Sequence, residues 1–242
     1  MEKLRQLTRL ELFYHVPPGL LELTSEYFLE RQYAPGTKLR KEGRRENYLV
    51  FIIDGYVKAV SRGFEDDEFI VDVYGEQQSI ENIAVYLDQP SPVTVSAITE
   101  VTTLEIHRSH FIEHLADHPD VSRGLQRELV EQNRRMLRRL QELSVSSAES
   151  RLAMLFYRFA LAVGRGTRLD NGEMGIRIDL PLRRNDIAQL ISVRTETAIR
   201  HMSRWDKQGP VRTDSQGFTI VDYDKLRELA GDVDPEPIAA TS

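Results

Sequence analysis

The sequence of 242 residues contains no cysteine. This absence excludes a disulfide framework, a cysteine nucleophile, a thiolate zinc site and a cysteine-ligated iron–sulfur cluster. Long hydrophobic runs are also missing, because every apolar run is far shorter than the roughly 18 residues of a membrane-spanning helix. The segment from Met1 to Leu7 lacks the apolar core of a signal peptide. We therefore expect a cytoplasmic protein that does not span a membrane.

Enzyme motifs are scarce as well. The chain has no glycine-rich phosphate loop and no nucleophile elbow around a serine. We predict that it is not an enzyme. Two alternatives stay open at this point: a metal-dependent hydrolase built on the histidines between His107 and His118, and a dimeric interaction protein that does not bind DNA. The length favours two moderate domains.

The net charge of −6 is distributed unevenly along the chain. Residues 1–149 carry 18 basic and 25 acidic side chains, whereas residues 150–230 carry 14 basic and 10 acidic ones. The last twelve residues add three acids and no base. Because phosphate groups respond to local charge rather than to the average of the chain, the basic segment is a candidate nucleic-acid contact.

Short strands separated by turns are expected between Glu30 and Ile106. Aromatic and β-branched residues mark the strand candidates, which are residues 48–53, 56–61, 69–74, 93–97 and 101–106. The pair Asp54-Gly55 between the first two predicts a tight hairpin turn. Strands at this spacing are typical of a closed or sandwiched β unit. The first thirty residues look weakly helical and are interrupted by Pro17-Pro18-Gly19.

A long helix is predicted over residues 121–143, after a short helix that Pro119 ends. Apolar side chains recur along the long helix close to the coiled-coil period; they are Leu125, Leu129, Met136, Leu140 and Leu143. Asn133 lies beside this stripe, where a single buried asparagine fixes the register of a parallel coiled coil. The stripe is therefore either the seam of a homodimer or a face packed on its own domain.

The segment from Arg183 to Gly209 is the most informative. Ahead of it, residues 144–150 are predicted to be a hinge or a helix boundary, residues 149–163 a helix, residues 164–175 a loop and residues 176–180 a strand. Then follow a short helix, the turn Ser192-Val193-Arg194, and a second helix over residues 195–208. Two short helices joined by a three-residue turn are the geometry of a helix-turn-helix, whose second helix enters the major groove of DNA. Residues 211–221 predict a β-hairpin wing.

The second helix of this motif has an inner and an outer face. Ala198, Met202 and Trp205 recur at helical spacing and form the inner face. Glu196 and Arg200 lie one turn apart on the outer face, where a carboxylate accepts from cytosine N4 and a guanidinium binds guanine O6 and N7. The alternative is a solvated ion pair. The predicted DNA contacts are Arg194, Thr195, Glu196, Thr197, Ile199 and Arg200.

The segment from Arg183 to Val211 resembles the winged helix-turn-helix of the Crp/Fnr superfamily of bacterial transcription regulators. The family's Glu and Arg, four residues apart, fall on Glu196 and Arg200. Two positions depart from its pattern: Ile199 stands where many Fnr-type members have Ser, and Ser192 replaces a common turn Gly. The operator half-site therefore need not be the usual one.

The resemblance extends over residues 10–230, since glycines at Gly36, Gly43, Gly55 and Gly75 look like those of the family's sensor domain. It implies an α+β fold with an N-terminal double-stranded β-roll, cyclic-nucleotide-binding-like, in residues 1–118. A dimerisation helix would follow in 119–145 and a C-terminal winged helix-turn-helix in 146–230. Residues 231–242 would form a disordered tail. The implied dimer-helix residues are Leu125, Leu129, Asn133, Met136, Leu140 and Leu143.

The resemblance also implies an effector pocket. In cyclic-nucleotide-binding members a Gly-Glu pair holds the ribose, and Gly75-Glu76 match it. The cyclic phosphate is held by an Arg followed by Ser or Thr, but Ser91-Pro92 align there, which removes a guanidinium and a backbone N–H. Met136-Leu137 align with the pair that contacts the base. Since a bidentate phosphate contact is lost, we expect that cyclic AMP is not the effector.

Four of the six histidines are clustered, and His110, His114 and His118 would share one helix face, a spacing that can ligate a metal. A haem- or metal-dependent sensor variant of the regulator is therefore an alternative. The main prediction has no metal and no cofactor, with a different or absent small-molecule effector. The expected partners are double-stranded DNA, a second copy of the chain and RNA polymerase, and no membrane.

Overall fold

The computed structural model describes residues 2–63, 68–145 and 147–231, except for the side chain of residue 145. The chain divides into two compact units, residues 1–66 with 71–137 and residues 67–70 with 138–242. The predicted tail lies outside the described residues from position 232 onward.

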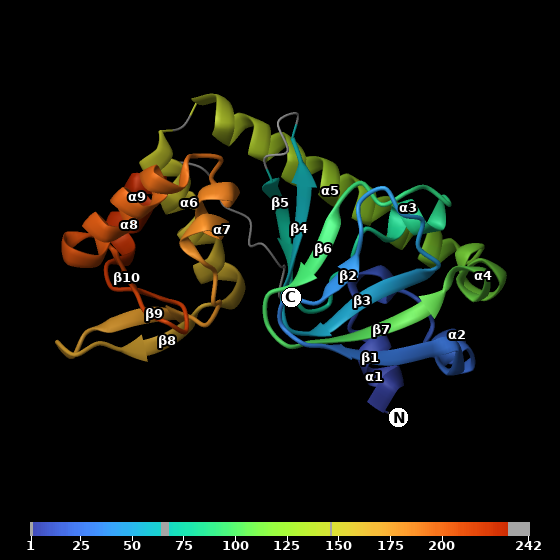
Figure 1. Cartoon of the computed structure of the whole chain (residues 1–242). Coiled ribbons are helices and arrows are strands. Elements are labelled where there is room, and N and C mark those ends of the chain that lie inside the picture. The colour runs from blue at the N-terminus through green and yellow to red at the C-terminus, as the bar shows by residue number, and fades with distance from the viewer. Residues whose placement is uncertain (1, 64–67, 146, 232–242) are drawn as a thin grey trace. The chain divides into compact units, whose positions relative to one another are not determined.

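The first unit holds two sheets (Figure 1). One has the order β1-β7-β3, from β1 (Phe28–Tyr33), β7 (Val101–His107) and β3 (Tyr48–Asp54). The other has the order β2-β6-β4-β5, from β2 (Lys38–Arg40), β6 (Thr94–Ala97), β4 (Val57–Arg62) and β5 (Glu68–Tyr74). β7 pairs antiparallel with β1 and β3, and β6 pairs antiparallel with β2 and β4. The predicted β unit is confirmed.

The hairpin between β3 and β4 turns at Gly55, as the sequence predicts. Gly55 has φ +89°, and a Cβ added there would lie 2.1 Å from the carbonyl oxygen of Glu100. Only glycine meets both conditions without strain. The hairpin brings alternate side chains of both strands to one apolar cluster, which also takes residues from β6 and β7 and therefore lies between the two sheets.

Short helices cover the first sheet. They are α1 (Glu2–Thr8), the 3-10 turn η1 (Glu11–Phe13), α2 (Pro18–Thr24), the 3-10 turn η2 (Ser25–Tyr27), α3 (Asn82–Tyr86) and α4 (Arg108–Phe111). α2 begins at Pro18, in the first helical turn, where proline is tolerated because the missing N–H has no helical partner. Phe13, Phe28 and Phe51 form one buried aromatic group in this core.

The short helix predicted before Pro119 is α4 continued by a π turn, η3 (Ile112–Ala116). The long helix is α5 (Pro119–Val145), two residues longer at each end than predicted. Gly124 of α5 packs closely against the chain, since a Cβ there would lie 2.3 Å from the carbonyl oxygen of Leu12. α5 is thereby seated on the first core, in which Val121 and Leu125 are buried.

The second unit begins its own fold with α6 (Ala148–Val163), capped by Ser147, whose side chain accepts from the N–H of Ser150. Its sheet has the order β10-β11-β9-β8 and consists of β8 (Arg165–Arg168), β9 (Met174–Ile178), β10 (Val211–Thr213) and β11 (Phe218–Ile220). The predicted loop over residues 164–175 is wrong, because β8 pairs with β9 across that segment. The exposed, arginine-bearing β8 lacks the alternating apolar pattern that marks a strand.

The remaining helices are α7 (Arg184–Leu190), α8 (Thr195–Gln208) and α9 (Tyr223–Ala230). α9 is absent from the sequence prediction. Asp222 caps α9, and the helix packs along α6, where the ring of Tyr223 stacks on that of Tyr157 at 5.3 Å between centroids. Among the described residues, no helix is long and apolar enough to cross a membrane.

Candidate DNA-binding interface and sensor region

α7 and α8 form the predicted helix-turn-helix (Figure 1). At the start of α7, the backbone N–H of Arg183 donates to the carboxylate of Asp186 at 2.9 Å. The turn is closed by the Val193 N–H, which donates to the Ala188 carbonyl at 3.0 Å. Ser192 sits in this turn at φ +52°. This left-handed conformation explains why glycine is common in the family at this position. Serine adopts it here at some cost in conformational free energy.

α8 has the two faces that its sequence predicts. Ala198, Met202 and Trp205 are each at most 3% exposed and pack inside the unit. Glu196 and Arg200 are exposed on the opposite face, and Ile199 is 40% exposed beside them. A helix whose inner face is this well packed presents its outer residues in a fixed orientation, as base reading requires.

The first turn of α8 is tied to the start of α7. Thr195 Oγ1 donates to Asn185 Oδ1 at 2.9 Å, so that Thr195 is partly covered. Arg194 is exposed at the N-cap position, and Thr197 is partly buried on the flank of the helix. Asn185 is absent from the predicted contact set. Its distance of ten residues from Thr195 gives no periodic signal, which is why the pairing was not predicted.

Glu149 of α6 binds two side chains in the C-terminal half of α8. Trp205 Nε1 donates to Glu149 Oε1 at 2.9 Å, and the guanidinium of Arg204 binds the same oxygen. Burial alone would raise the pKa of Glu149, but the hydrogen bonds from Trp205 and Arg204 outweigh it and hold this pKa below its usual value. The recognition helix is therefore anchored through an ionised carboxylate.

The wing is the hairpin of β10 and β11, and an arginine from β9 fixes its tip. Arg177 binds both carboxylate oxygens of Asp214, at 2.5 and 3.0 Å, and also Asp179 at 2.8 Å. Asp214 in turn accepts from the N–H groups of Gln216 and Gly217 at 2.8 and 3.0 Å. The hydrogen bond from Arg177 is the main reason why the pKa of Asp214 is lowered to about 2.

The predicted effector residues differ in burial and in hydrogen bonding. Gly75 is buried against the ring of Tyr56, whereas Glu76 is exposed. Ser91 is buried, and both its donors bind backbone carbonyls: Oγ donates to Val93 at 2.8 Å, and the N–H donates to Arg44 at 2.8 Å. Pro92, Met136 and Leu137 are exposed, the last two at 62% and 55%.

Acidic side chains surround the segment that follows β5. Ser79 donates to the carboxylate of Glu128 on α5, and Tyr74 donates to Glu81 at 2.7 Å. Burial raises the pKa of Glu128 to about 7, with further contributions from Glu11 and Glu81. Arg135 opposes these acids and pairs with Asp72 at 3.1 Å. Arg135 is therefore surrounded by the acidic side chains of this part of the first unit.

The apolar stripe of α5 is largely exposed. Its exposed members, from 38% to 62% exposed, are Leu129, Met136, Leu140 and Leu143, and Val130 and Leu137 beside them are 56% and 55% exposed. Asn133 is exposed between them. Leu125 differs from the prediction: it is only 6% exposed and belongs to the core of the first unit, because α5 is seated there by Gly124. Val130 and Leu137 flank the stripe and were not predicted to belong to the seam.

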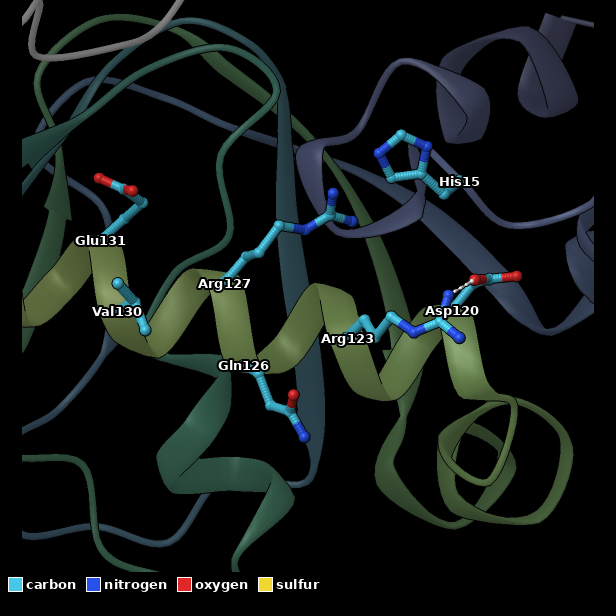
Figure 2. A pocket seen from close by; sticks show the side chains of 7 residues that line it. All are labelled: His15, Asp120, Arg123, Gln126, Arg127, Val130 and Glu131. Carbon is cyan, nitrogen blue, oxygen red and sulfur yellow. Dashed lines mark hydrogen bonds and ion pairs between the residues drawn. The ribbon is translucent and has the colours of Figure 1, made fainter.

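A cavity of about 350 Å³ lies beside the first half of α5. Its lining residues are His15, Asp120, Arg123, Gln126, Arg127, Val130 and Glu131. Figure 2 shows the side chain of Arg127 directed towards His15, and Arg123 next to Asp120, to which it donates at 2.8 Å. None of the predicted effector residues lines this cavity. It adjoins the exposed stripe through Val130.

The histidine cluster differs from the predicted row. The potential ligand atoms of His110, Glu113 and His114 all lie within 4.8 Å of one another. His118 is not part of this group; its Nδ1 accepts from the backbone N–H of Asp120 at 3.3 Å instead. The spacing H-x-x-E-H in the sequence is the signal that includes Glu113.

Comparisons with known proteins agree with this two-unit arrangement. Residues 30–118 match the cyclic nucleotide-binding domain family, and residues 150–229 match the Crp-like helix-turn-helix domain family. A CRP-like cAMP-activated global transcriptional regulator from Mycobacterium tuberculosis is 24% identical over 225 residues, which are 93% of this chain and 98% of that protein.

Solved structures show the same fold. FixK2 from Bradyrhizobium japonicum superposes with a TM-score of 0.71 at 15% identity, covering 85% of this chain and 98% of that one. A CRP/FNR-family transcriptional regulator from Thermus thermophilus gives a TM-score of 0.66 at 14% identity, covering 84% of this chain and 98% of that one.

The fold and the exposed face of α8 define a transcription regulator that binds DNA through a helix-turn-helix. With both domain families present in the order sensor, long helix and DNA-binding domain, the chain belongs to the Crp/Fnr superfamily. The family resemblance and the fold class expected from the sequence are confirmed.

Proposed function

We propose that the protein acts as a homodimer that binds an inverted DNA repeat. The observation that carries this proposal is the exposed apolar stripe of α5, which leaves Leu129, Met136, Leu140 and neighbouring side chains in water in the single chain. Their spacing is that of a coiled-coil seam, and two copies would bury them together. Asn133, exposed within the stripe, would set the register of the two helices.

The DNA sequence would be read by Glu196 and Arg200. Both are exposed one turn apart on the outer face of α8, whose inner face is fully packed. A guanidinium recognises guanine and a carboxylate recognises the amino group of cytosine. A two-fold axis along the dimer helices would place the two recognition helices about 34 Å apart, on half-sites one helical turn apart.

The sensor domain would respond to something other than cyclic AMP, or to no ligand. Ser91-Pro92 supply no guanidinium for a cyclic phosphate, and both donors of Ser91 are taken by the backbone carbonyls of Val93 and Arg44. Glu11, Asp72 and Glu128 surround the guanidinium of Arg135, and Asp72 pairs with it. An added anion would have to compete with these acids for Arg135. No cofactor is required by this proposal.

A homodimeric regulator of this kind would act in the cytoplasm and would contact RNA polymerase once bound to its operator. It would have no enzymatic activity. These three statements follow from the family's mode of action rather than from a particular contact. Double-stranded DNA is the one partner that the residues of α8 support directly.

The experiment is selection of bound sequences from a random duplex DNA pool by the full chain, without added ligand and at two salt concentrations. We expect an inverted repeat with half-sites one turn apart and an affinity that falls steeply with salt. Changing the half-site spacing by half a helical turn should abolish the binding. Recovery of a single, unrepeated half-site would contradict the dimer arrangement.

Control by cyclic AMP is tested separately, on the full chain, by calorimetry with cyclic AMP. We expect no heat of binding at millimolar ligand and no change in operator affinity. A stoichiometric complex would contradict the proposed loss of the phosphate contact, while leaving the DNA reading through Glu196 and Arg200 untouched.

A further inference from the structure

The turn between β7 and α5 brings two imidazoles and a carboxylate together. His110, Glu113 and His114 lie at positions i, i+3 and i+4, which share one helix face. His114 Nε2 lies 3.7 Å from Glu113 Oε2, close to the separation of two ligands bound to the same ion. The three candidate ligand atoms lie within 4.8 Å of one another, so small side-chain rotations would bring each to about 2 Å from one cation.

The two imidazoles are held in place before any ion arrives. The ring of Tyr27, at the end of η2, stacks on both His110 and His114, with centroids 4.6 Å apart in each case. The two imidazole planes are within 12° of each other. Because a tyrosine from a different segment fixes both rings, less side-chain entropy is lost when they bind a ligand.

Two further features single out this turn. His110 Nδ1 is buried and accepts or donates no hydrogen bond among the described residues. A buried ring nitrogen without a partner in the protein is costly, and a bound water, a bound ion or a functional role accounts for most such groups. The helix also widens to a π turn over Ile112–Ala116, between the first histidine and α5. Single π turns occur frequently at functional sites.

We infer that His110, Glu113 and His114 form a binding site for a divalent transition-metal cation, Zn²⁺ in the first place. Two imidazoles and one carboxylate are a zinc ligand set that leaves a fourth position for water. One class of zinc peptidases uses the same H-x-x-E-H spacing on a helix. Ca²⁺ and Mg²⁺ are disfavoured, since both prefer oxygen ligands.

The place of the site in the fold suggests a regulatory effect. The π turn ends at Ala116, three residues before α5 begins at Pro119. A cation bound there would cross-link the two turns of this segment and fix the point at which α5 leaves the sensor domain. The proposed site does not depend on how the protein reads DNA, and it is tested by metal binding alone.

The test is calorimetric titration of Zn²⁺ into the tag-free full chain near neutral pH, with visible absorption of bound Co²⁺ as a second measurement. We expect one cation per chain. His114→Ala and Glu113→Gln should each weaken binding at least roughly tenfold. His118→Ala is the matched control, because His118 is turned towards Asp120, and it should leave the affinity within about twofold.

Folding is checked by measuring the thermal unfolding of each variant without metal. The unfolding temperature of Glu113→Gln should match that of the parent, because the side chain of Glu113 is exposed. Failure of the parent chain to bind Zn²⁺ stoichiometrically would overturn the inference. A loss of Zn²⁺ affinity in His118→Ala as large as that in His114→Ala would overturn it too. That result would show that the cation is bound by the row His110, His114 and His118 instead.

Discussion

Trp205 Nε1 lies 2.9 Å from Glu149 Oε1, so the only tryptophan of the chain hydrogen-bonds the recognition helix to the first turn of α6. The same carboxylate oxygen accepts from Arg204. Two donors on one ionised acceptor make this the strongest polar link that the described residues show between α8 and α6. This link fixes the position of α8 against α6.

Glu149→Ala should therefore weaken DNA binding without changing its specificity. The change leaves a buried indole N–H without an acceptor, which costs roughly 1–3 kcal/mol of folding free energy. The affinity should fall by a similar factor for the operator and for operators with single base changes, because Glu149 touches no base. Competition binding across an operator panel measures this. Glu228→Ala, an exposed glutamate on α9, is the control and should have no effect.

Arg200→Ala should change specificity. Loss of a bidentate contact to guanine should cost about 1–3 kcal/mol on the preferred sequence and make the four bases at that position nearly equivalent. Lys207→Ala is the matched control, since Lys207 is exposed two turns further along the same face of α8. An equal loss on every sequence for Arg200→Ala would make Arg200 a phosphate contact instead.

The α5 stripe predicts which side chains hold the dimer. Leu140, 55% exposed in the single chain, should become buried in a dimer, so Leu140→Arg should shift the protein to monomers in analytical ultracentrifugation and weaken operator binding. Leu23→Arg makes the same change at a side chain 75% exposed on α2 and should leave the assembly unchanged. A dimer that survives Leu140→Arg would place the interface elsewhere.

Gly55 and Gly36 illustrate two different reasons why a position requires glycine, a positive φ and a lack of space for a Cβ. Both have positive φ, +89° and +83°, but a Cβ at Gly55 would lie 2.1 Å from the Glu100 carbonyl oxygen, whereas Gly36 has open space. Gly36→Ala should cost roughly 1 kcal/mol from backbone strain alone. Gly55→Ala should cost clearly more, because β3 and β4 must also separate from the segment before β7. Urea unfolding of the two variants compares these costs.

Regular periodicity explains how much could be predicted from the sequence. The helix α5 and the two faces of α8 repeat with the helical period, and β3 to β7 are marked by aromatic and β-branched residues, so all of these were predicted within a few residues. The strands β1 and β2 were not among the predicted strands. β8 has no such repeat, and Leu125 has the spacing of the stripe although Gly124 seats it in the core. Periodicity therefore predicts which face of a helix or strand is apolar, but not whether its own domain or a second chain covers that face.

Contacts between distant segments escape this kind of prediction. Thr195 with Asn185, Trp205 with Glu149 and Arg177 with Asp214 join residues 10 to 56 positions apart. Each pair fixes part of the DNA-binding unit, yet nothing in the local sequence couples its members. The metal-ligand group is an intermediate case: its spacing is visible in the sequence, but the stacking of Tyr27 on both histidines is visible only in the fold.

Glu128 makes the stability of the first unit depend on pH. Its carboxyl has a pKa raised from 4.5 to about 7, principally by burial. Between these two values the folded protein holds a proton that the unfolded chain has lost, so the free energy of unfolding falls as the pH rises from about 5 to about 8. One pKa unit corresponds to about 1.4 kcal/mol. Because this side chain is only partly buried and is screened by water, we expect a total change of roughly 1–2 kcal/mol.

Glu128→Gln should remove this slope. The amide still accepts the hydrogen bond from Ser79 but carries no charge at any pH, so the variant should be more stable than the parent at about pH 8 and similar to it at about pH 5. Urea unfolding at several pH values across this range measures the difference. Glu131→Gln, three residues further along α5 in an exposed ion pair with Arg134, is the control and should keep the slope of the parent. A slope that persists in Glu128→Gln would assign the titration to another of the acids around Arg135, of which Glu11 is the first to test, since burial raises its pKa as well.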